Sequence, residues 1–331
     1  MKSVADYKIL SEIRGFVGDD LERTGNLVLA VSRAAPETVR PRLEKMLSCH
    51  GKRIRAMLLL LLAKSGPASS PDRAVRAAAS IELLHLASLV HDDVIDQTET
   101  RRGEPTVHAL WGNRAAVLLG DYALAKSLEL VVDDEDSRIP LTISRASGQL
   151  VAGELLELQL AGNEVSPKQY EEIVAGKTAA LVEASTVCGG VIAGHGPETV
   201  AALAQLGRDV GFGFQMIDDL LDFGIGAGNL GKAKHTDLAN GVMTLPTILY
   251  LESASPDEAR VMLGLLREVP SDHGLIPRVV ALLEESGAFD RARAVAREHI
   301  DRATETVLTL PPWSGRDALL KLIGAMLHRS F

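Results

Sequence analysis

The feature of this sequence that most restricts its fold is a succession of long helix-forming stretches separated by prolines. The stretches are rich in Ala, Leu, Glu and Arg, which favour helices, whereas strand-like alternation with Asn-Gly or Asp-Gly turns is hard to find. Ser166, Pro167 and Gln169 occupy the positions of a helix start, as N-cap, first-turn residue and third residue. Apolar stripes at helical spacing predict long helices over 74–96, 114–132, 143–160, 167–191 and 198–223.

We therefore expect an all-α protein with a single domain over residues 1–331, in which the first ~25 residues form a peripheral helix. No linker-like stretch divides the chain, and hydrophobic residues make up 46% of it, enough for a large core. One short motif occurs twice, and its two copies would have to meet in space, which favours one core over two.

The overall charge limits the class of ligand. A net charge of −9 argues against a nucleic-acid partner, because such proteins usually carry a broad basic face. An anionic small molecule would instead need local basic clusters or metal ions. Cys49 and Cys188 form no CxxC pair and no disulfide framework, and the N-terminus lacks the apolar segment of a signal peptide. We therefore expect a cytoplasmic protein.

The repeated motif is an aspartate cluster, DDxxD, at the end of an apolar helix. Carboxylates on such helices repel one another and lose solvation, so they favour a bound cation. Oxygen ligands one helical turn apart suit Mg²⁺, and no Cys/His set has zinc spacing. The alternative is that the clusters are two solvated acidic patches. This interpretation is weaker for a motif that occurs twice than for a single copy. The candidate metal ligands are Asp92, Asp93, Asp96, Asp218, Asp219 and Asp222.

Basic residues lie near both clusters. One group opens the apolar run that begins at Met57, another follows the first cluster in a short loop, a third lies within a helical stretch, and a fourth follows the second cluster. Arg53 alone is interpreted as an ordinary surface cation. Adjacent Arg101 and Arg102 repel each other, yet paired guanidinium groups suit diphosphate oxygens. A site with an acidic wall and a basic rim is therefore expected.

Together these motifs resemble those of the trans-polyprenyl diphosphate synthases, and more closely the longer-chain members. The matching stretches follow the family order along the chain. They are residues 51–55, 81–96, 101–106, 120–121, 176–178, 214–219, 231–232 and 244–246. The resemblance implies the isoprenoid-synthase fold, a bundle of long antiparallel helices around a central cavity. It also implies a homodimer, with a transient membrane contact for product release.

The resemblance further assigns roles to residues. Asp92, Asp96 and Asp218 would be the principal ligands of about three Mg²⁺ ions, for which Mn²⁺ can substitute, and Asp93, Asp219 and Asp222 would complete the two walls. Isopentenyl diphosphate would bind at Gly51, Lys52, Arg55, His85 and Arg102, and the diphosphate of the allylic substrate at Arg101, Lys177 and Lys232. Lys177, Arg101, Thr178 and Gln215 would lie at the reacting centre. Val242 stands where the family has a lysine, which puts one diphosphate contact in doubt.

The implied reaction is a prenyl transfer. The allylic carbon–oxygen bond breaks, the double bond of isopentenyl diphosphate attacks the cation, and a proton leaves to the departing diphosphate. Two other functions remain open. A class I terpene cyclase also uses DDxxD but usually carries a different second motif. A regulatory subunit of a heteromeric synthase commonly loses the aspartates, all six of which are present here.

The residues four and five positions before Asp92 bear on product length. They are Ser88 and Ala87, both small, whereas bulky aromatic residues at these places in the resembling family close the tunnel early. We therefore expect a product longer than geranylgeranyl diphosphate, of about six to eight isoprene units. The alternative is that both residues only pack helices together and that a deeper side chain such as Leu84 sets a shorter limit.

Overall fold

The computed structural model describes residues 4–48, 51–68, 70–101, 103–225 and 235–328, and most of them are helical. The first half contains α1 (Val4–Ala30), a 3₁₀ turn (Val31–Ala34), α2 (Arg40–Leu47), α3 (Ile54–Leu62), α4 (Pro71–Ile95), α5 (Val107–Trp111), α6 (Asn113–Glu129) and α7 (Arg138–Leu160). The second half contains α8 (Pro167–Val174), a π-helical turn (Ala175–Ala179), α9 (Ala180–Ile192), α10 (Pro197–Asp222), α11 (Thr236–Ala239), α12 (Leu245–Ser253), α13 (Pro256–Glu268), a 3₁₀ turn (His273–Leu275), α14 (Ile276–Glu285), α15 (Ala288–Thr309) and α16 (Arg316–His328).

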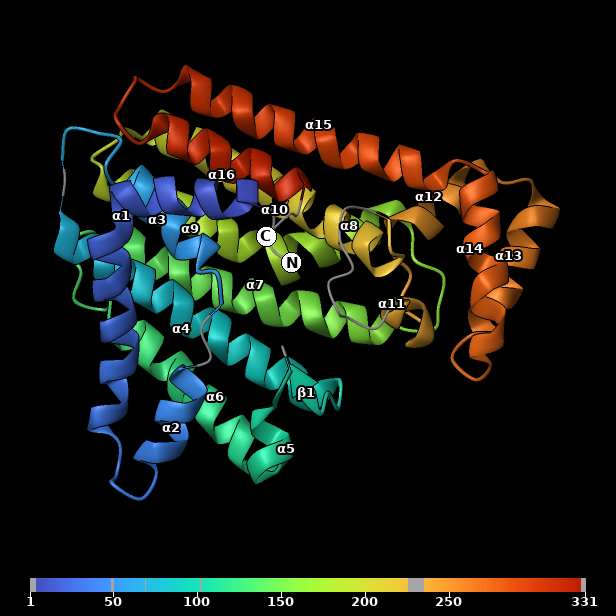
Figure 1. The fold of residues 1–331 in the computed structure, drawn as a ribbon, viewed down its shortest axis with the longest axis horizontal. Coiled ribbons are helices and arrows are strands. Elements are labelled where there is room, and N and C mark those ends of the chain that lie inside the picture. The colour runs from blue at the N-terminus through green and yellow to red at the C-terminus, as the bar shows by residue number, and fades with distance from the viewer. Residues whose placement is uncertain (1–3, 49–50, 69, 102, 226–234, 329–331) are drawn as a thin grey trace.

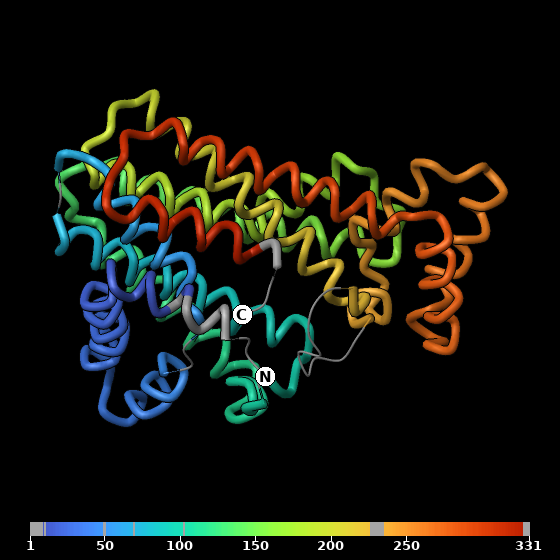
Figure 2. Tube along the Cα trace, turned by 45° about the horizontal axis from the view of Figure 1, so that its top comes forward, coloured from blue at the N-terminus to red at the C-terminus, as the bar shows by residue number. Residues whose placement is uncertain are grey.

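The long helices form a bundle, which confirms the all-α prediction. In Figure 1, α4, α7, α10 and α15 run side by side along the longest axis, while α13 and α14 stand across them at one end. The turned view in Figure 2 keeps that arrangement, with the blue α1 and α2 at the opposite end. Among the described residues, the only strands are β1 (Thr100–Arg101) and β2 (Glu104–Pro105), a short antiparallel pair. No helix of these stretches is long and apolar enough to cross a bilayer.

The core is organised around α3, which other helices surround. Its residues from Ala56 to Leu62 are all at most 1% exposed. A helix that is apolar on every side has to be buried, and α3 packs against α1, α4, α9 and α16. A second hydrophobic cluster joins α8, α10 and the helices from α12 to α15, and a third joins α1, α2, α4 and α6.

The helix boundaries follow the sequence signals closely except at one place. The predicted start at Ser166 is confirmed: its side chain accepts from the Gln169 amide at 3.3 Å, and the Gln169 side chain accepts from the Ser166 amide at 2.9 Å. The prediction of one regular helix over 167–191 is wrong in its middle, because the π-helical turn at Ala175–Ala179 separates α8 from α9. Such turns insert a residue and often occur at functional sites.

Candidate active site

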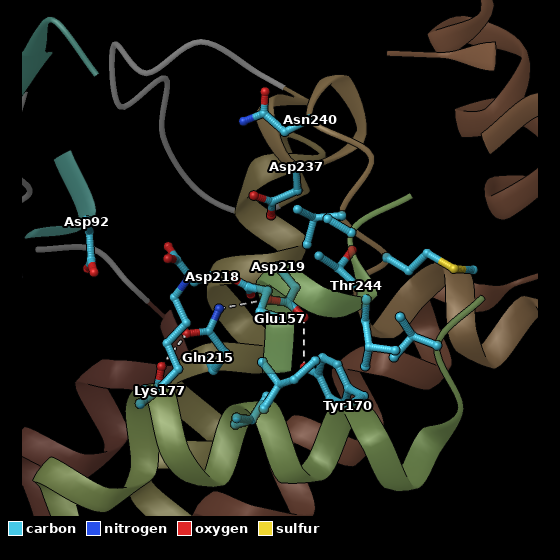
Figure 3. Close-up of a pocket in the computed structure, with 18 of the residues that line it drawn as sticks. Asp92, Glu157, Tyr170, Lys177, Gln215, Asp218, Asp219, Asp237, Asn240 and Thr244 are labelled. Carbon is cyan, nitrogen blue, oxygen red and sulfur yellow. Dashed lines mark hydrogen bonds and ion pairs between the residues drawn. The ribbon is translucent and has the colours of Figure 1, made fainter. Parts of the chain in front are cut away.

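A cavity of about 350 Å³ opens between α4, α7, α8 and α10. Both predicted aspartate clusters reach it. Asp92 and Asp96 come from the C-terminal end of α4, and Asp218 and Asp219 from the C-terminal end of α10. Figure 3 shows Asp92 on one wall and Asp218 and Asp219 on the other. The two motif copies, 126 residues apart in the chain, therefore line one site.

The carboxyl group of Asp92 lies in an electrostatically unfavourable place. Burial raises its pKa to about 7, the nearby Glu154 adds to this effect, and Lys177 and Arg101 oppose it. A bound cation would reverse this penalty. In the described part of the chain, however, no three acidic, histidine or cysteine side chains converge closely enough to hold an ion between them. Carboxylates that face a cavity without enclosing an ion suit Mg²⁺, because Mg²⁺ keeps several waters and also binds substrate phosphates.

Asp93, in contrast, faces Arg101. It is 4% exposed, and the Arg101 Nε donates to its Oδ1 at 2.8 Å. Burial raises the Asp93 pKa, although the Arg101 contact opposes this. Arg101 lies in β1, where it pairs with Glu104 of β2. Asp93 therefore orients Arg101, a residue that itself lines the cavity.

Asp219 is also engaged on both of its oxygens. Gln215 Nε2 donates to its Oδ1 at 2.9 Å, and Tyr170 and the Leu245 amide donate to its Oδ2 at 2.7 and 3.2 Å. It is 2% exposed, and burial raises its pKa to about 6 despite these hydrogen bonds. Thr178 extends the network by donating to Gln215 Oε1 at 2.7 Å. The predicted pair of Thr178 and Gln215 is thus brought together.

Asp222 ends α10 and contacts the start of α11. Its two oxygens accept from the backbone amides of Thr236 and Asp237 at 3.0 and 3.2 Å. Asp237 lines the cavity. Burial raises the Asp237 pKa to about 8, and Asp222, Asp219 and Glu157 add to the effect. The second wall therefore carries more carboxyl groups than its motif alone indicates.

Lys177 lies in the π-helical turn, between two glutamates that the sequence analysis missed. Its Nζ forms ion pairs with Glu157 and, at 3.0 Å, with Glu154. Burial lowers the Lys177 pKa, but these two carboxylates outweigh it and raise the pKa above the usual value. Both glutamates come from α7, three residues apart. Glutamates at this spacing on a helix are usually solvated, so the sequence carries no local signal that identifies them.

Arg55 and His85 form a second group, deeper along α4. His85 lies two turns before Asp92 on the same helix face, and its Nε2 is 3.1 Å from Arg55 Nη1. Burial lowers the Arg55 pKa. Gly51 and Lys52 precede this pair on an exposed segment. Two further predicted residues, Arg102 and Lys232, lie outside the described residues.

The chain is similar to several known proteins. The family model described as polyprenyl synthetase matches residues 36–283. A short chain isoprenyl diphosphate synthase from Methanothermobacter thermautotrophicus is 34% identical, over 91% of this chain and 93% of its own. A nonaprenyl diphosphate synthase from Mycobacterium tuberculosis is 36% identical, over 90% and 88%. The crystal structure of a polyprenyl synthase from Caulobacter crescentus, complexed with calcium and isoprenyl diphosphate, is similar with a TM-score of 0.88, at 29% identity over 97% and 98% of the two chains.

Proposed function

This chain belongs to the polyprenyl synthetase family, and we propose that it joins isopentenyl diphosphate to an allylic diphosphate, such as dimethylallyl, geranyl or farnesyl diphosphate, to make a linear polyprenyl diphosphate. The observation that carries the proposal is the meeting of two carboxylate clusters from α4 and α10 across one cavity that also contains Lys177. This arrangement suits a reaction in which diphosphate leaves, because cations can then stabilise its developing charge.

The donor set fits Mg²⁺ as the cofactor. Asp92, Asp96 and Asp218 present oxygen atoms to the cavity from two facing walls, and about three ions could lie between them and the substrate phosphates. Bound Mg²⁺ would supply Lewis acidity that stabilises the leaving diphosphate. A related crystal structure contains calcium together with isoprenyl diphosphate, which supports a divalent cation here.

The protein's own residues then bind and orient the two substrates. Lys177 and Arg101, with Lys232, hold the allylic diphosphate, while Lys52, Arg55, His85 and Arg102 hold isopentenyl diphosphate. Thr178 and Gln215 face the reacting carbon. The cavity lining also contains apolar side chains, which would help to keep water away from an allylic cation. They are Val165, Ile173, Val174 and Met243.

The ion pairs of Lys177 suggest an order of events. Two carboxylates neutralise this lysine in the structure, so its charge becomes available to a diphosphate only when Glu154 and Glu157 gain another cationic partner. Metal ions that arrive with the diphosphate would supply one. We therefore propose that Glu154 and Glu157 hold Lys177 in place until substrate binds.

We also propose that the enzyme is a homodimer formed through α6 and α7. Large apolar side chains on these neighbouring helices are exposed: Leu118 is 68%, Val151 56%, Leu155 61% and Leu158 62% accessible. Four such side chains on adjoining helices exceed the scattered single exposures of a typical monomer surface. A second copy with the same apolar face would cover them.

One incubation tests the proposed function. The purified chain is mixed with labelled isopentenyl diphosphate, Mg²⁺ and each allylic primer in turn, and the products are separated by length after phosphatase treatment. We expect linear prenyl alcohols. A cyclised hydrocarbon would identify a terpene cyclase instead, and a lack of product with every primer would support a regulatory subunit.

A further inference from the structure

Arg53, at the start of α3, has a backbone conformation that residues with side chains seldom adopt. Its φ is 55° and its ψ is 39°, in the left-handed region that favours glycine. Helices usually begin with an extended residue whose side chain accepts a hydrogen bond from the first turn, and Arg53 makes no such cap. A conformation of this kind persists only where the surrounding structure imposes it.

A contact with α1 accompanies this conformation. The Arg53 guanidinium crosses Gly25, and its Nη1 donates to the carbonyl oxygen of Leu21 at 3.1 Å. Gly25 makes room for this crossing, since a Cβ there would lie 2.4 Å from Nη1. The interpretation of Arg53 as an ordinary surface cation is therefore wrong: it is a half-buried tie between α1 and α3.

The same short segment carries residues assigned above to isopentenyl diphosphate. Lys52 directly precedes Arg53, and Arg55 follows it after one residue. On the other side α4 holds the segment, because Arg55 Nη1 lies 3.1 Å from His85 Nε2 and the Ala56 amide donates to Glu82 at 3.2 Å. The segment is thus fixed from α4 through Arg55 and from α1 through Arg53.

We propose that Arg53 is a positioning residue for the isopentenyl diphosphate half of the site. It does not touch the substrate. Its left-handed turn sets the angle between the segment that bears Lys52 and the first turn of α3, which bears Arg55, and its contact with α1 maintains that angle. The proposal rests on the prenyl transfer proposed above and adds a residue whose effect is confined to one of the two substrates.

Gly25→Ala is the sharpest test. The new methyl group displaces the guanidinium, while alanine in a helix is intrinsically more favourable than glycine. We expect the KM for isopentenyl diphosphate to rise about tenfold, the loss of one hydrogen-bond-sized interaction, with an unchanged KM for the allylic substrate and an unchanged or higher Tm. If the contact had a purely structural role, its loss would lower the Tm and raise the KM values for both substrates together.

Arg53→Ala removes the tie from the other side. It should raise the same KM, and the double variant Gly25→Ala/Arg53→Ala should be no worse than Arg53→Ala alone, because both changes break one contact. Arg53→Lys keeps a donor for Leu21 and should recover part of the affinity. Arg291→Ala is the matched control: that arginine donates to the carbonyl oxygens of Ser286 and Leu249, away from the cavity, and its loss should leave both KM values unchanged.

The outcomes separate this inference from the function on which it rests. Wild-type enzyme that forms no prenyl product would refute the function. Wild-type turnover combined with an unchanged KM for isopentenyl diphosphate in Gly25→Ala and Arg53→Ala, or with equal changes in both KM values, would overturn the role of Arg53 alone. Calorimetric binding of isopentenyl diphosphate to each variant checks that the KM change is a change in affinity.

Discussion

Individual carboxyl groups have different surroundings in this site, and we expect their substitutions to differ accordingly. Asp92 and Asp218 line the cavity from opposite walls. Asp92→Asn and Asp218→Asn should each lower kcat by at least about a thousandfold, because charge stabilisation of the leaving group is lost. The fold should survive, since burial already disfavours the Asp92 charge. Steady-state turnover and circular dichroism measure both effects. Near-normal turnover in either variant, or of the wild type in excess chelator, would contradict the assignment.

A buried carboxylate outside the site, Asp209, has a lowered pKa, in contrast to the raised pKa of Asp92. Asp209 is 1% exposed. Burial raises its pKa, but hydrogen bonds from His299, Gln205 and Arg302 outweigh burial and depress it. A carboxyl group whose pKa is lower in the folded state stabilises the protein at pH values above its unfolded-state pKa. This stabilisation is lost as the pH falls through the folded-state pKa. Asp209→Asn should therefore lower the free energy of unfolding by about 2–3 kcal/mol at pH 7.

The difference between Asp209→Asn and wild type should shrink as the pH falls below about 4, when the wild-type carboxylate also becomes protonated. Thermal unfolding at a series of pH values measures it. Asp257→Asn is the control, because the Asp257 ion pair with Arg260 is exposed and should contribute little at any pH. A pH-independent gap for Asp209→Asn would show that packing, not charge, accounts for the loss.

For individual residues, the sequence predicted which side chains lie in the site better than it predicted the side chains that they contact. The aspartates, Lys177 and Gln215 could be identified because their motifs are local. Glu154 and Glu157 could not, because glutamates three residues apart on a helix are common and usually solvated. Only the approach of α7 to the π-helical turn, which is a tertiary contact, brings them to Lys177.

Among the elements, the junction between α7 and the π-helical turn positions Lys177. A Cβ on Gly153 would lie 2.5 Å from the Lys177 backbone nitrogen and 2.9 Å from the carbonyl carbon of Gly176. Gly153→Ala should therefore push Lys177 away from the cavity and lower kcat/KM for the allylic substrate about tenfold or more. Gly148→Ala, on the same helix with open space around the new methyl group, should have no effect. Equal activities of the two variants would refute this account of the junction.

The helices themselves were largely predictable, because apolar periodicity and proline boundaries act locally. The start of α8 at Ser166 is an example. The π-helical turn was not predictable, since the one unusual residue from Ala175 to Ala179, Gly176, also occurs in ordinary helices. Gly176 and Gly153 allow their backbones to approach closely, and that approach depends on two elements and not on one.

For the molecule as a whole, product length depends on where the chain can grow. Ala87 is 2% exposed and belongs to the cluster that joins α4 to α6. Ser88 is half-buried, and its hydroxyl donates a hydrogen bond to the His85 carbonyl oxygen. We keep the prediction of a product of about six to eight isoprene units. Ser88→Phe and Ala87→Phe should shift products to shorter chains without abolishing condensation, as chromatography of the products would show. A wild-type product that ends at geranylgeranyl diphosphate would contradict the open tunnel.

Assembly can be tested through the exposed apolar face. Leu155→Arg combined with Leu118→Arg places charges at the centre of the proposed interface and should convert a dimer into a monomer, as light scattering after size exclusion would show. Val261→Arg, at an exposed apolar residue of α13, is the control and should leave the mass unchanged. A double variant that keeps the dimeric mass would place the interface elsewhere.

The two walls of the cavity differ in how much sequence change they can accept. Along α10, a Cβ on Gly207 would lie 2.5 Å from Glu183 Cα, one on Gly211 2.5 Å from Ala179 Cα, and one on Gly213 2.7 Å from Ile300 Cδ1. Backbone packed this closely leaves few tolerated substitutions. As such enzymes diverge toward products of other lengths, we expect α10 and the part of α7 around Gly153 to stay nearly constant, while substitutions accumulate on α4.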